Sequence, residues 1–216
     1  MNIILFGPPG AGKGTQSINI SKKFNLFKVS TGDLLRDEIK KNTKLGDDIK
    51  IKIDKGLLAP DSVIENLINN ILLNKDFSNR LIFDGFPRTY SQALSLESLL
   101  KNYKQKISCV LSLNVDKDNV IKRILGRQTC TKCGLIFNQY FNPVNHSNHS
   151  CDPCFLTKRD DDNKKTIISR YDTYVEKTLP ILNFYKKQNL LHEINGVAQI
   201  DQIYKEIEAI ITSLEA

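Results

Sequence analysis

The sequence predicts an α/β fold, with a parallel sheet between two layers of helices, and three observations lead to that prediction. Short apolar runs at residues 3–6, 81–83, 107–113 and 190–194 have the length and the residue types of buried strands. Between them lie segments whose apolar residues recur three and four positions apart, the spacing of amphipathic helices. A glycine-rich turn directly follows the first apolar run. Strands that alternate with helices in this way are typical of doubly wound α/β proteins.

The elements can be placed in order along the chain. The first strand ends in the turn GPPG at residues 7–10, and we expect a helix to begin near Lys13. Two further helices are expected at residues 63–72 and 200–214, where isoleucine and leucine recur at helical spacing. The later apolar runs supply the other strands.

Two stretches do not fit this alternation. Residues 31–59 are charged, look helical, contain glycine breaks at Gly46 and Gly56, and need no strand. Residues 128–163 are rich in turn residues, with Asn-Pro at 142–143 and a polar run at 145–150. We interpret both as insertions at the carboxyl end of the sheet, where ligands bind in such folds.

Composition excludes several classes of protein. The chain has 216 residues, of which 40% are hydrophobic and 25% charged, as expected of one large folded domain and not of a disordered segment. Its apolar runs are far shorter than the ~20 residues that a membrane span needs. The N-terminus, MNIILFG, lacks the basic region and cleavage site of a signal peptide. We therefore expect a cytoplasmic protein without a membrane partner.

The charge balance favours an anionic partner. Thirty-one basic and 24 acidic residues give a net charge of +7, which suits a nucleotide, a nucleic acid or a membrane surface equally. The positions of the arginines say more about the kind of partner than the total charge does.

The strongest motif is GPPGAGKGT at residues 7–15, which follows a predicted strand and opens a predicted helix. Its glycines allow backbone N–H groups to converge on phosphate oxygens, and the helix N-terminus and Lys13 add positive charge. The hydroxyl of the usual phosphate-loop pattern falls at Thr15, because Gly14 intervenes. The motif predicts a phosphate-binding loop.

A second motif, LIFDGFPR at residues 81–88, places Asp84 at the end of a hydrophobic strand. Phosphate-loop enzymes hold Mg²⁺ through an aspartate in this position. Arg88 follows the same strand end, so we expect it to point into the same cleft.

Arginines recur at the expected loop and helix ends in a chain whose cations are mostly lysines. Their planar guanidinium groups match phosphoryl oxygens, and as a group they predict phosphate clamps. Arg123 and Arg127 are four positions apart and would share a face if both lay on one helix. The set is Arg36, Arg88, Arg123, Arg127, Arg159 and Arg170.

Four of the five cysteines form two C-x2-C pairs separated by 17 residues, a spacing typical of zinc sites. Four thiolates would close the coordination shell, so the ion would be structural. His146 and His149 precede the third cysteine and are alternative ligands, although polar loop histidines are the simpler interpretation. Cys109 lies in an apolar run and is expected in a buried strand. The predicted ligands are Cys130, Cys133, Cys151 and Cys154.

Taken together, these motifs resemble the adenylate kinase family, in its bacterial-type form with a long lid. The resemblance covers nearly the whole chain: GPPGAGKGT at 7–15, STGDLLR at 30–36, GLLAP at 56–60, DGFPRTYSQA at 84–93, RILGR at 123–127 and RDDDN at 159–163. It implies a five-stranded parallel sheet of the P-loop NTPase type, a helical nucleotide-binding insertion and a small zinc-bearing lid. The implied core is 1–29, 60–126 and 165–216, with an AMP-binding insertion at 30–59 and the lid at 127–164.

The resemblance also implies a reaction and its residues. The reaction is Mg²⁺-dependent phosphoryl transfer, ATP + AMP = 2 ADP, by a monomer. The catalytic residues would be Lys13, Asp84, Arg88, Arg123, Arg159 and Arg170. ATP would be bound by Gly10, Ala11, Gly12, Lys13, Gly14, Thr15, Arg123, Arg127, Ile136, Phe137 and Ala198. AMP would be bound by Thr31, Arg36, Leu57, Leu58, Ala59, Gly85, Phe86, Pro87, Arg88, Gln92, Arg159 and Arg170. Asp161 and Asp162 would support the closed lid. Family lids are often braced by three cysteines and an aspartate, so Cys154 is a departure.

Two alternatives stay open. A related kinase could accept CMP, UMP or dTMP, although Gln92 with Thr31 and the long lid favour AMP. A zinc module on an NTPase scaffold could instead bind nucleic acid, but residues 128–163 contain few basic side chains. We therefore expect ATP, AMP and ADP as partners and no nucleic acid.

Overall fold

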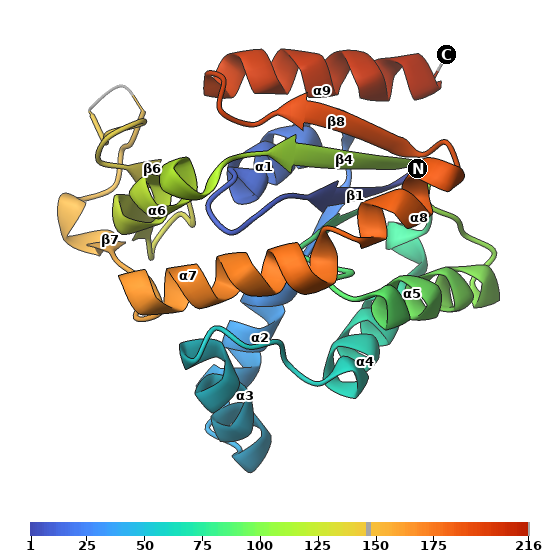
Figure 1. Cartoon of the computed structure of the whole chain (residues 1–216), viewed down its shortest axis with the longest axis horizontal. Helices are drawn as coiled ribbons and strands as arrows, with labels where there is room; N and C mark the ends of the chain where they lie inside the picture. Colours follow the sequence, from blue (N-terminus) through green and yellow to red (C-terminus); the bar gives the residue numbers. More distant parts are fainter. Residues whose placement is uncertain (146–147, 216) are drawn as a thin grey trace.

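The protein is an α/β structure built on one five-stranded parallel sheet, as the sequence predicts (Figure 1). A computed structural model describes residues 1–145 and 148–215. The strands of the sheet follow the order β2-β3-β1-β4-β8. They are β1 (Asn2–Phe6), β2 (Phe27–Ser30), β3 (Leu81–Asp84), β4 (Cys109–Asn114) and β8 (Leu191–Asn195).

The strand register brings the loops that carry the motifs together at the carboxyl end of the sheet. Leu5 pairs with Asp84, Phe6 pairs with Ser112, and Ser30 pairs with Asp84. The carboxyl ends of β1, β2, β3 and β4 therefore lie side by side, as parallel pairing requires. The glycine-rich turn after β1 lies between the loops that follow β3 and β4.

Two apolar cores cover the faces of the sheet, as expected when parallel strands are buried on both sides. One core joins the sheet to α1, α6 and α9, and the other joins it to α4, α5 and α8. Their bounds are α1 (Lys13–Phe24), α4 (Asp61–Leu72), α5 (Tyr90–Asn102), α6 (Lys117–Leu125), α8 (Ile181–Lys187) and α9 (Ile200–Glu215). Cys109 is fully buried in the sheet, as its apolar surroundings predict.

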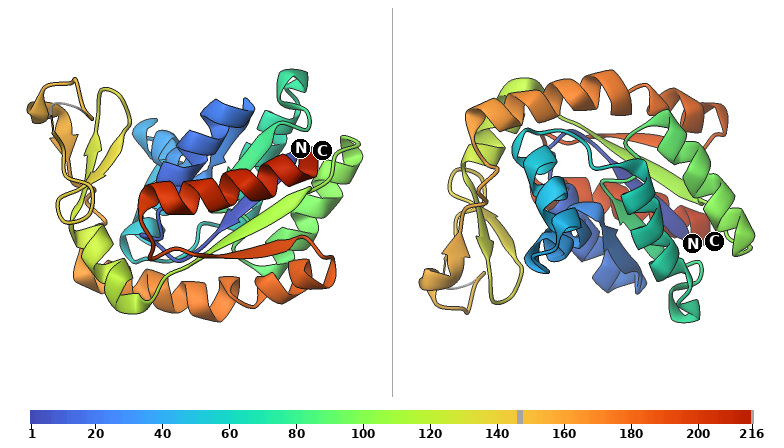
Figure 2. Two further views of the ribbon diagram at one scale, coloured as in Figure 1. Left: turned by 90° about the horizontal axis from the view of Figure 1, so that it is seen from above. Right: turned by 90° about the horizontal axis from the view of Figure 1, so that it is seen from below.

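Two segments project from the carboxyl edge of the sheet (Figure 2). The first is a pair of helices, α2 (Thr31–Lys40) and α3 (Lys44–Asp54). The second follows α6 and contains a three-stranded antiparallel sheet of β5 (Arg127–Cys130), β6 (Ile136–Asn138) and β7 (Leu156–Thr157). The chain returns through α7 (Lys164–Thr173), which continues into a π-helical turn, η3 (Tyr174–Thr178). Short 3-10 turns lie at η1 (Lys75–Phe77) and η2 (Pro153–Phe155).

The structure corrects one sequence-based expectation. Helix α6 ends at Leu125, and Arg127 opens β5, so Arg123 and Arg127 do not share a helix face. A Cβ on Gly126 would lie 2.6 Å from the Tyr140 ring and 2.8 Å from the Asn138 side chain, so glycine lets the second segment fold closely against the end of the helix.

In the part of the chain that the structure describes, no helix is long and apolar enough to cross a membrane.

Candidate active site and metal centre

The turn after β1 has the backbone of a phosphate loop. Gly10 and Gly12 have φ values of 76° and 95°, which favour glycine. A Cβ on Gly10 would lie 2.7 Å from the Ile124 side chain, so the loop also needs glycine for close packing against α6. Helix α1 begins immediately afterwards, with no acidic residue in its first turn. Its free N–H groups therefore present positive partial charge to the cleft.

Lys13 lies at the start of α1, with its ammonium group turned back onto the loop. Its Nζ donates hydrogen bonds to the carbonyl oxygens of Gly7, at 2.7 Å, and Pro8, at 2.9 Å. Burial lowers the pKa of Lys13 to about 8, and the nearby Asp84 carboxylate opposes that shift only in part. An anion placed at the loop would meet a cation that lacks a carboxylate partner at hydrogen-bond distance.

Asp84 ends β3 beneath the loop. Its Oδ2 lies 3.5 Å from the Ser17 hydroxyl and 3.9 Å from Lys28 Nζ. The same lysine lies 3.6 Å from Asp33, so it links the end of β3 with the first turn of α2. Asp84 is largely buried but lines the cleft, and a carboxylate beside a phosphate loop supplies the hard oxygen ligand that Mg²⁺ prefers. The residues therefore fit a magnesium site completed by phosphate oxygens.

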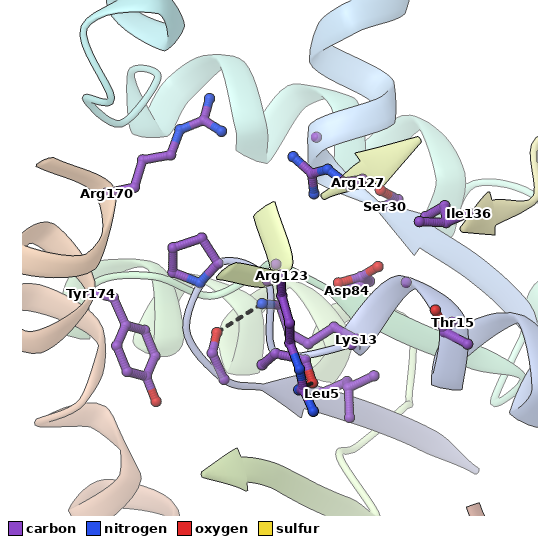
Figure 3. Close-up of a pocket in the computed structure, with 18 of the residues that line it drawn as sticks. Leu5, Lys13, Thr15, Ser30, Asp84, Arg123, Arg127, Ile136, Arg170 and Tyr174 are labelled. Atoms are coloured by element: carbon purple, nitrogen blue, oxygen red, sulfur yellow. Dashed lines mark hydrogen bonds between the residues drawn. The ribbon is translucent and has the colours of Figure 1, made fainter. Parts of the chain in front are cut away.

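The predicted arginines converge on one cleft of about 310 Å³ above the loop. Figure 3 shows Arg123, Arg127 and Arg170, which come from α6, β5 and α7, around the same cleft as Lys13, Thr15 and Asp84. Arg36, Arg88 and Arg159 line the same cleft. Segments far apart in the sequence thus contribute cations to one space.

Several of these arginines are held by carboxylates or carbonyls. Arg127 Nε donates to Asp162 at 2.8 Å, and Arg170 forms an ion pair with Asp161. Burial raises the pKa of Asp161, but Arg170 outweighs it and holds that pKa below its usual value. Ion pairs of this kind fix side-chain direction, which matters more here than their stability.

Arg36 and Arg159 have different surroundings, because Arg36 pairs with a carboxylate and Arg159 lies near other arginines. Arg36 pairs with Asp33, whose pKa is lowered to about 2 because this interaction outweighs burial. Arg159 lies among other cations. Burial, followed by the positive charges of Arg127 and Arg36, lowers its pKa to about 10. The local excess of positive charge is a site for a polyanion.

A smaller cavity opens beside the cleft, between β3 and the helical segment. The Thr31 hydroxyl and Arg88 Nε both donate to the Gly85 carbonyl, at 2.9 and 2.7 Å. Gln92 accepts from the Arg88 backbone N–H at 2.7 Å and donates to Asp61 at 2.6 Å. The cavity has mixed polar and apolar walls, formed by Thr31, Leu35, Leu58, Ala59, Ile64, Gly85, Phe86, Arg88 and Gln92. Leu57 and Pro87 line the large cleft instead.

Part of the lining of the large cleft is apolar. Ile136, Phe137 and Ala198 belong to it, as the resemblance implies. A Cβ on Gly14 would lie 3.1 Å from Ile136 Cδ1, so β6 lies directly over the phosphate loop. Gln16, which the sequence analysis missed, donates to the Ile200 carbonyl at 3.0 Å and ties α1 to the start of α9.

Three of the predicted cysteines gather with a histidine in the second segment. One ligand atom from each of Cys130, Cys133, Cys151 and His149 lies within 4.8 Å of the others. His149 is 8% exposed, and neither of its ring nitrogens has a hydrogen-bond partner among the described residues. Burial raises the pKa of the Cys130 thiol, but the backbone N–H of Cys133 and further donors outweigh it and lower that pKa to about 6. Three thiols and an orphaned imidazole fit a tetrahedral zinc ion.

The structure differs from the expected ligand set at one position. Cys154 is exposed and lies outside this group in the described part of the chain. The Asp152 side chain accepts a hydrogen bond from the Cys154 backbone N–H at 2.8 Å, at the start of η2. The alternative ligand His149 lies in this group, whereas His146 lies outside the described residues.

Comparison with known proteins places the chain in a family. The adenylate kinase family model matches residues 5–190. The chain belongs to the adenylate kinase family. The adenylate kinase of Pelagibacter ubique (strain HTCC1062) is 49% identical over 211 residues, which cover 98% of this chain and 99% of that protein. The adenylate kinase of Archaeoglobus fulgidus is 40% identical over 218 residues, which cover both chains completely. That of Syntrophobacter fumaroxidans is 42% identical over 98% of this chain and all of its own.

Family membership gives the activity. The chain is a phosphotransferase of the adenylate kinase type, which transfers a phosphoryl group reversibly from Mg-ATP to AMP and yields two molecules of ADP. Such a reaction requires two nucleotide sites that meet at the transferred phosphoryl group.

Proposed function

We propose that the cleft divides into a donor side and an acceptor side, with the residues named from the sequence in the roles that the family resemblance implies. The phosphate loop, residues 10–15, would hold the ATP phosphates through backbone N–H groups, and Arg123, Ile136, Phe137 and Ala198 would surround the adenosine. The smaller cavity would take the AMP base against Thr31 and Gln92. Supporting this division, Ile136, Phe137 and Ala198 line the large cleft only, whereas Thr31 and Gln92 line the smaller cavity only.

The chemical step is an in-line displacement at the γ-phosphorus of ATP. A phosphate oxygen of AMP forms the new P–O bond, the bond to the β–γ bridging oxygen breaks, and the departing ADP keeps that electron pair. Such a transfer needs positioning and charge neutralisation more than a general base. Lys13, Arg88, Arg123, Arg159 and Arg170 would supply the neutralising charge.

Magnesium would be held by phosphate oxygens and Asp84, directly or through water. When bound, it draws negative charge away from the transferred phosphoryl group. Asp84 is suited to this because its carboxylate faces the loop with weak, replaceable neighbours at 3.5 and 3.9 Å.

We propose that residues 30–59 and 127–164 move as the AMP-binding insertion and the lid, relative to a core of 1–29, 60–126 and 165–216. Water competes with AMP as acceptor, so both segments must cover the nucleotides before transfer. The contact of Ile136 with Gly14, and the ion pair of Arg170 in the core with Asp161 in the lid, support closure of the lid onto the core.

We further propose that the lid holds one structural zinc ion, bound by Cys130, Cys133, Cys151 and His149. The segment is too small to keep an apolar core of its own, so a metal would stabilise it. The enzyme would work as a cytoplasmic monomer on free nucleotides, without nucleic-acid or membrane partners. The apolar and cationic linings of the cleft support small anionic substrates.

The role of Lys13 tests the proposal. Lys13→Met removes the cation and keeps the length of the side chain, so kcat should fall by about 10³-fold or more. The melting temperature should stay near that of the wild type, because Lys13 contacts only carbonyls of its own loop at hydrogen-bond distance within the described structure. Turnover within tenfold of the wild type would contradict the assignment.

A further inference from the structure

Helix α3 ends against the side of α7, and side chains of α7 complete its C-terminus (Figure 1). The Thr166 hydroxyl donates to the Asp54 carbonyl at 3.0 Å, and the Ser169 hydroxyl donates to the Lys55 carbonyl at 3.1 Å. Carbonyls at the end of a helix have no following intrahelical N–H to reach them. Two hydroxyls more than a hundred positions away in the sequence therefore satisfy them.

The residue that follows, Gly56, is packed onto the same two residues of α7. Gly56 is buried and has a φ of 74°, and a Cβ there would lie 3.0 Å from Ser169 Oγ and 3.1 Å from the Thr166 carbonyl. The chain reverses at this point and leads directly into residues 57–59, which line the large cleft. Contact with α7 thus fixes the position of the backbone at Gly56, from which residues 57–59 continue.

Thr166 is positioned for this contact by its own surroundings. It lies in the first turn of α7, is 5% exposed, and its backbone N–H donates to the Asn163 side chain at 3.0 Å. Thr166 and Ser169 are three residues apart and so lie on one face of the helix. Both hydroxyls face α3, and neither is among the residues that line the cleft.

We propose that Thr166 and Ser169, here called the α7 clamp, are positioning residues for the acceptor nucleotide. They hold the end of α3 and thereby set the backbone of Leu57, Leu58 and Ala59 against the AMP site. The inference rests on the proposed function, in which this backbone belongs to that site. Among the described residues the two clamp hydroxyls donate to carbonyls at the end of α3 and to no atom of the phosphate loop, so the α7 clamp acts on the acceptor side.

Variants that remove one hydroxyl at a time test the clamp. Thr166→Val keeps the branched shape and loses the donor, and Ser169→Ala loses the other donor. Each hydrogen bond contributes modestly, so the KM for AMP should rise about fivefold in each variant and about 20-fold in the double variant. The KM for ATP and the kcat at saturating AMP should stay within twofold of the wild type. Thr166→Ser, which keeps the hydroxyl, should restore the KM for AMP.

A matched control and a second readout separate positioning from general loosening. Ser213→Ala removes a hydroxyl that donates to the Ile210 carbonyl of its own helix, and it should leave both KM values unchanged. In the double clamp variant, amide hydrogen exchange at residues 56–59 should be about tenfold faster, with exchange in β1 and β4 unaltered. An unchanged KM for AMP in a folded double variant, or an equal rise in both KM values, would overturn the inference.

A third set of variants distinguishes its failure from failure of the proposed AMP site. Thr31→Val and Arg36→Gln change residues assigned to that site itself. If they raise the KM for AMP while the double clamp variant does not, the clamp is refuted and the site stands. If none of the variants changes it, the site and the clamp fall together.

Discussion

Lys13 shows how a single residue is prepared for its ligand. In the free protein its ammonium group donates to two carbonyls, and burial holds its pKa at about 8. The ordinary value for lysine is 10.5. A bound triphosphate would bring negative charge to the same atom and return the pKa toward or above that value. Nucleotide binding and protonation of Lys13 are therefore linked.

The linkage has a definite sign. At pH 9 Lys13 is mostly neutral in the free enzyme and charged in the complex, so ATP binding should take up a proton, approaching about one per site. Calorimetry in two buffers with different ionisation enthalpies measures this uptake. Lys13→Met should abolish it. Equal uptake by the variant and the wild type would show that another group is responsible.

The hydroxyl group of Tyr185 is buried, and no hydrogen bond in the described structure offsets the cost of removing it from water. The side chain is completely buried beside Phe6 and Phe184, and the hydroxyl has no hydrogen-bond partner in the described part of the chain. Burial therefore raises the pKa of Tyr185. A buried hydroxyl without a partner is unfavourable, while the aromatic ring packs well.

Two substitutions separate the ring from the hydroxyl. Tyr185→Phe should leave the free energy of unfolding unchanged or raise it by about 1 kcal/mol. Tyr185→Ala should lower it by about 3–5 kcal/mol, because a cavity is left in the core. Denaturant unfolding measures both, and a loss of stability in Tyr185→Phe would reveal a partner such as a buried water.

Most single residues of the site could be found from the sequence, and the exceptions share a physical cause. The glycines, Lys13 and Asp84 stand in contiguous motifs next to a strand, so their place follows from local order. Lys28 and Gln16 were missed because their partners, Asp84 and Ile200, are brought to them only by tertiary contacts. Nothing in their neighbours along the chain marks them.

At the scale of elements, the same limit applies to β2 and to the cysteine segment. Strand β2 is four residues long and half exposed at the sheet edge, so it lacks the continuous apolar run of a buried strand. In the metal group, two C-x2-C pairs predict four thiolates, but in the described structure His149, and not Cys154, lies with Cys130, Cys133 and Cys151. Spacing indicates that a metal binds and does not decide between equivalent ligands.

Ligand variants test the zinc assignment. His149→Ala should lower bound zinc well below one ion per chain, while Cys154→Ala should keep it, as measured by metal analysis of the purified protein. Stripping the metal should lower the melting temperature by about 5 °C or more, because the small sheet loses its central support. Loss of zinc in Cys154→Ala with retention in His149→Ala would restore the four-cysteine set.

At the scale of the whole molecule, the rigid sheet presents the phosphate loop while two segments cover it (Figure 2). Helix α7 touches both: Arg170 pairs with Asp161 of the lid, and the α7 clamp holds the end of α3. One helix therefore joins the donor and acceptor sides. The α7 clamp could not be predicted from motifs, because its bonds join residues more than a hundred positions apart, whereas Arg170 and Asp161 stand nine positions apart in the sequence.

We expect opening of these segments, and not the chemical step, to limit turnover. Large movements through solvent are slowed by viscosity, whereas transfer inside a closed site is not. In sucrose solutions of about twice the viscosity of water, kcat should fall about twofold. A polymeric crowder that raises only the bulk viscosity serves as the control. A kcat independent of sucrose would place the limit in the chemistry.

The most direct test of the whole account is the choice of acceptor. A coupled assay with Mg-ATP and AMP, CMP, UMP or dTMP in parallel measures ADP formation with each nucleotide. The proposed acceptor site assigns Thr31 and Gln92, which line the cavity beside the cleft, to the AMP base, so ADP should form rapidly with AMP and at least about 100-fold more slowly with the pyrimidine nucleotides. Comparable or faster turnover with a pyrimidine monophosphate would contradict the assignment of the acceptor site.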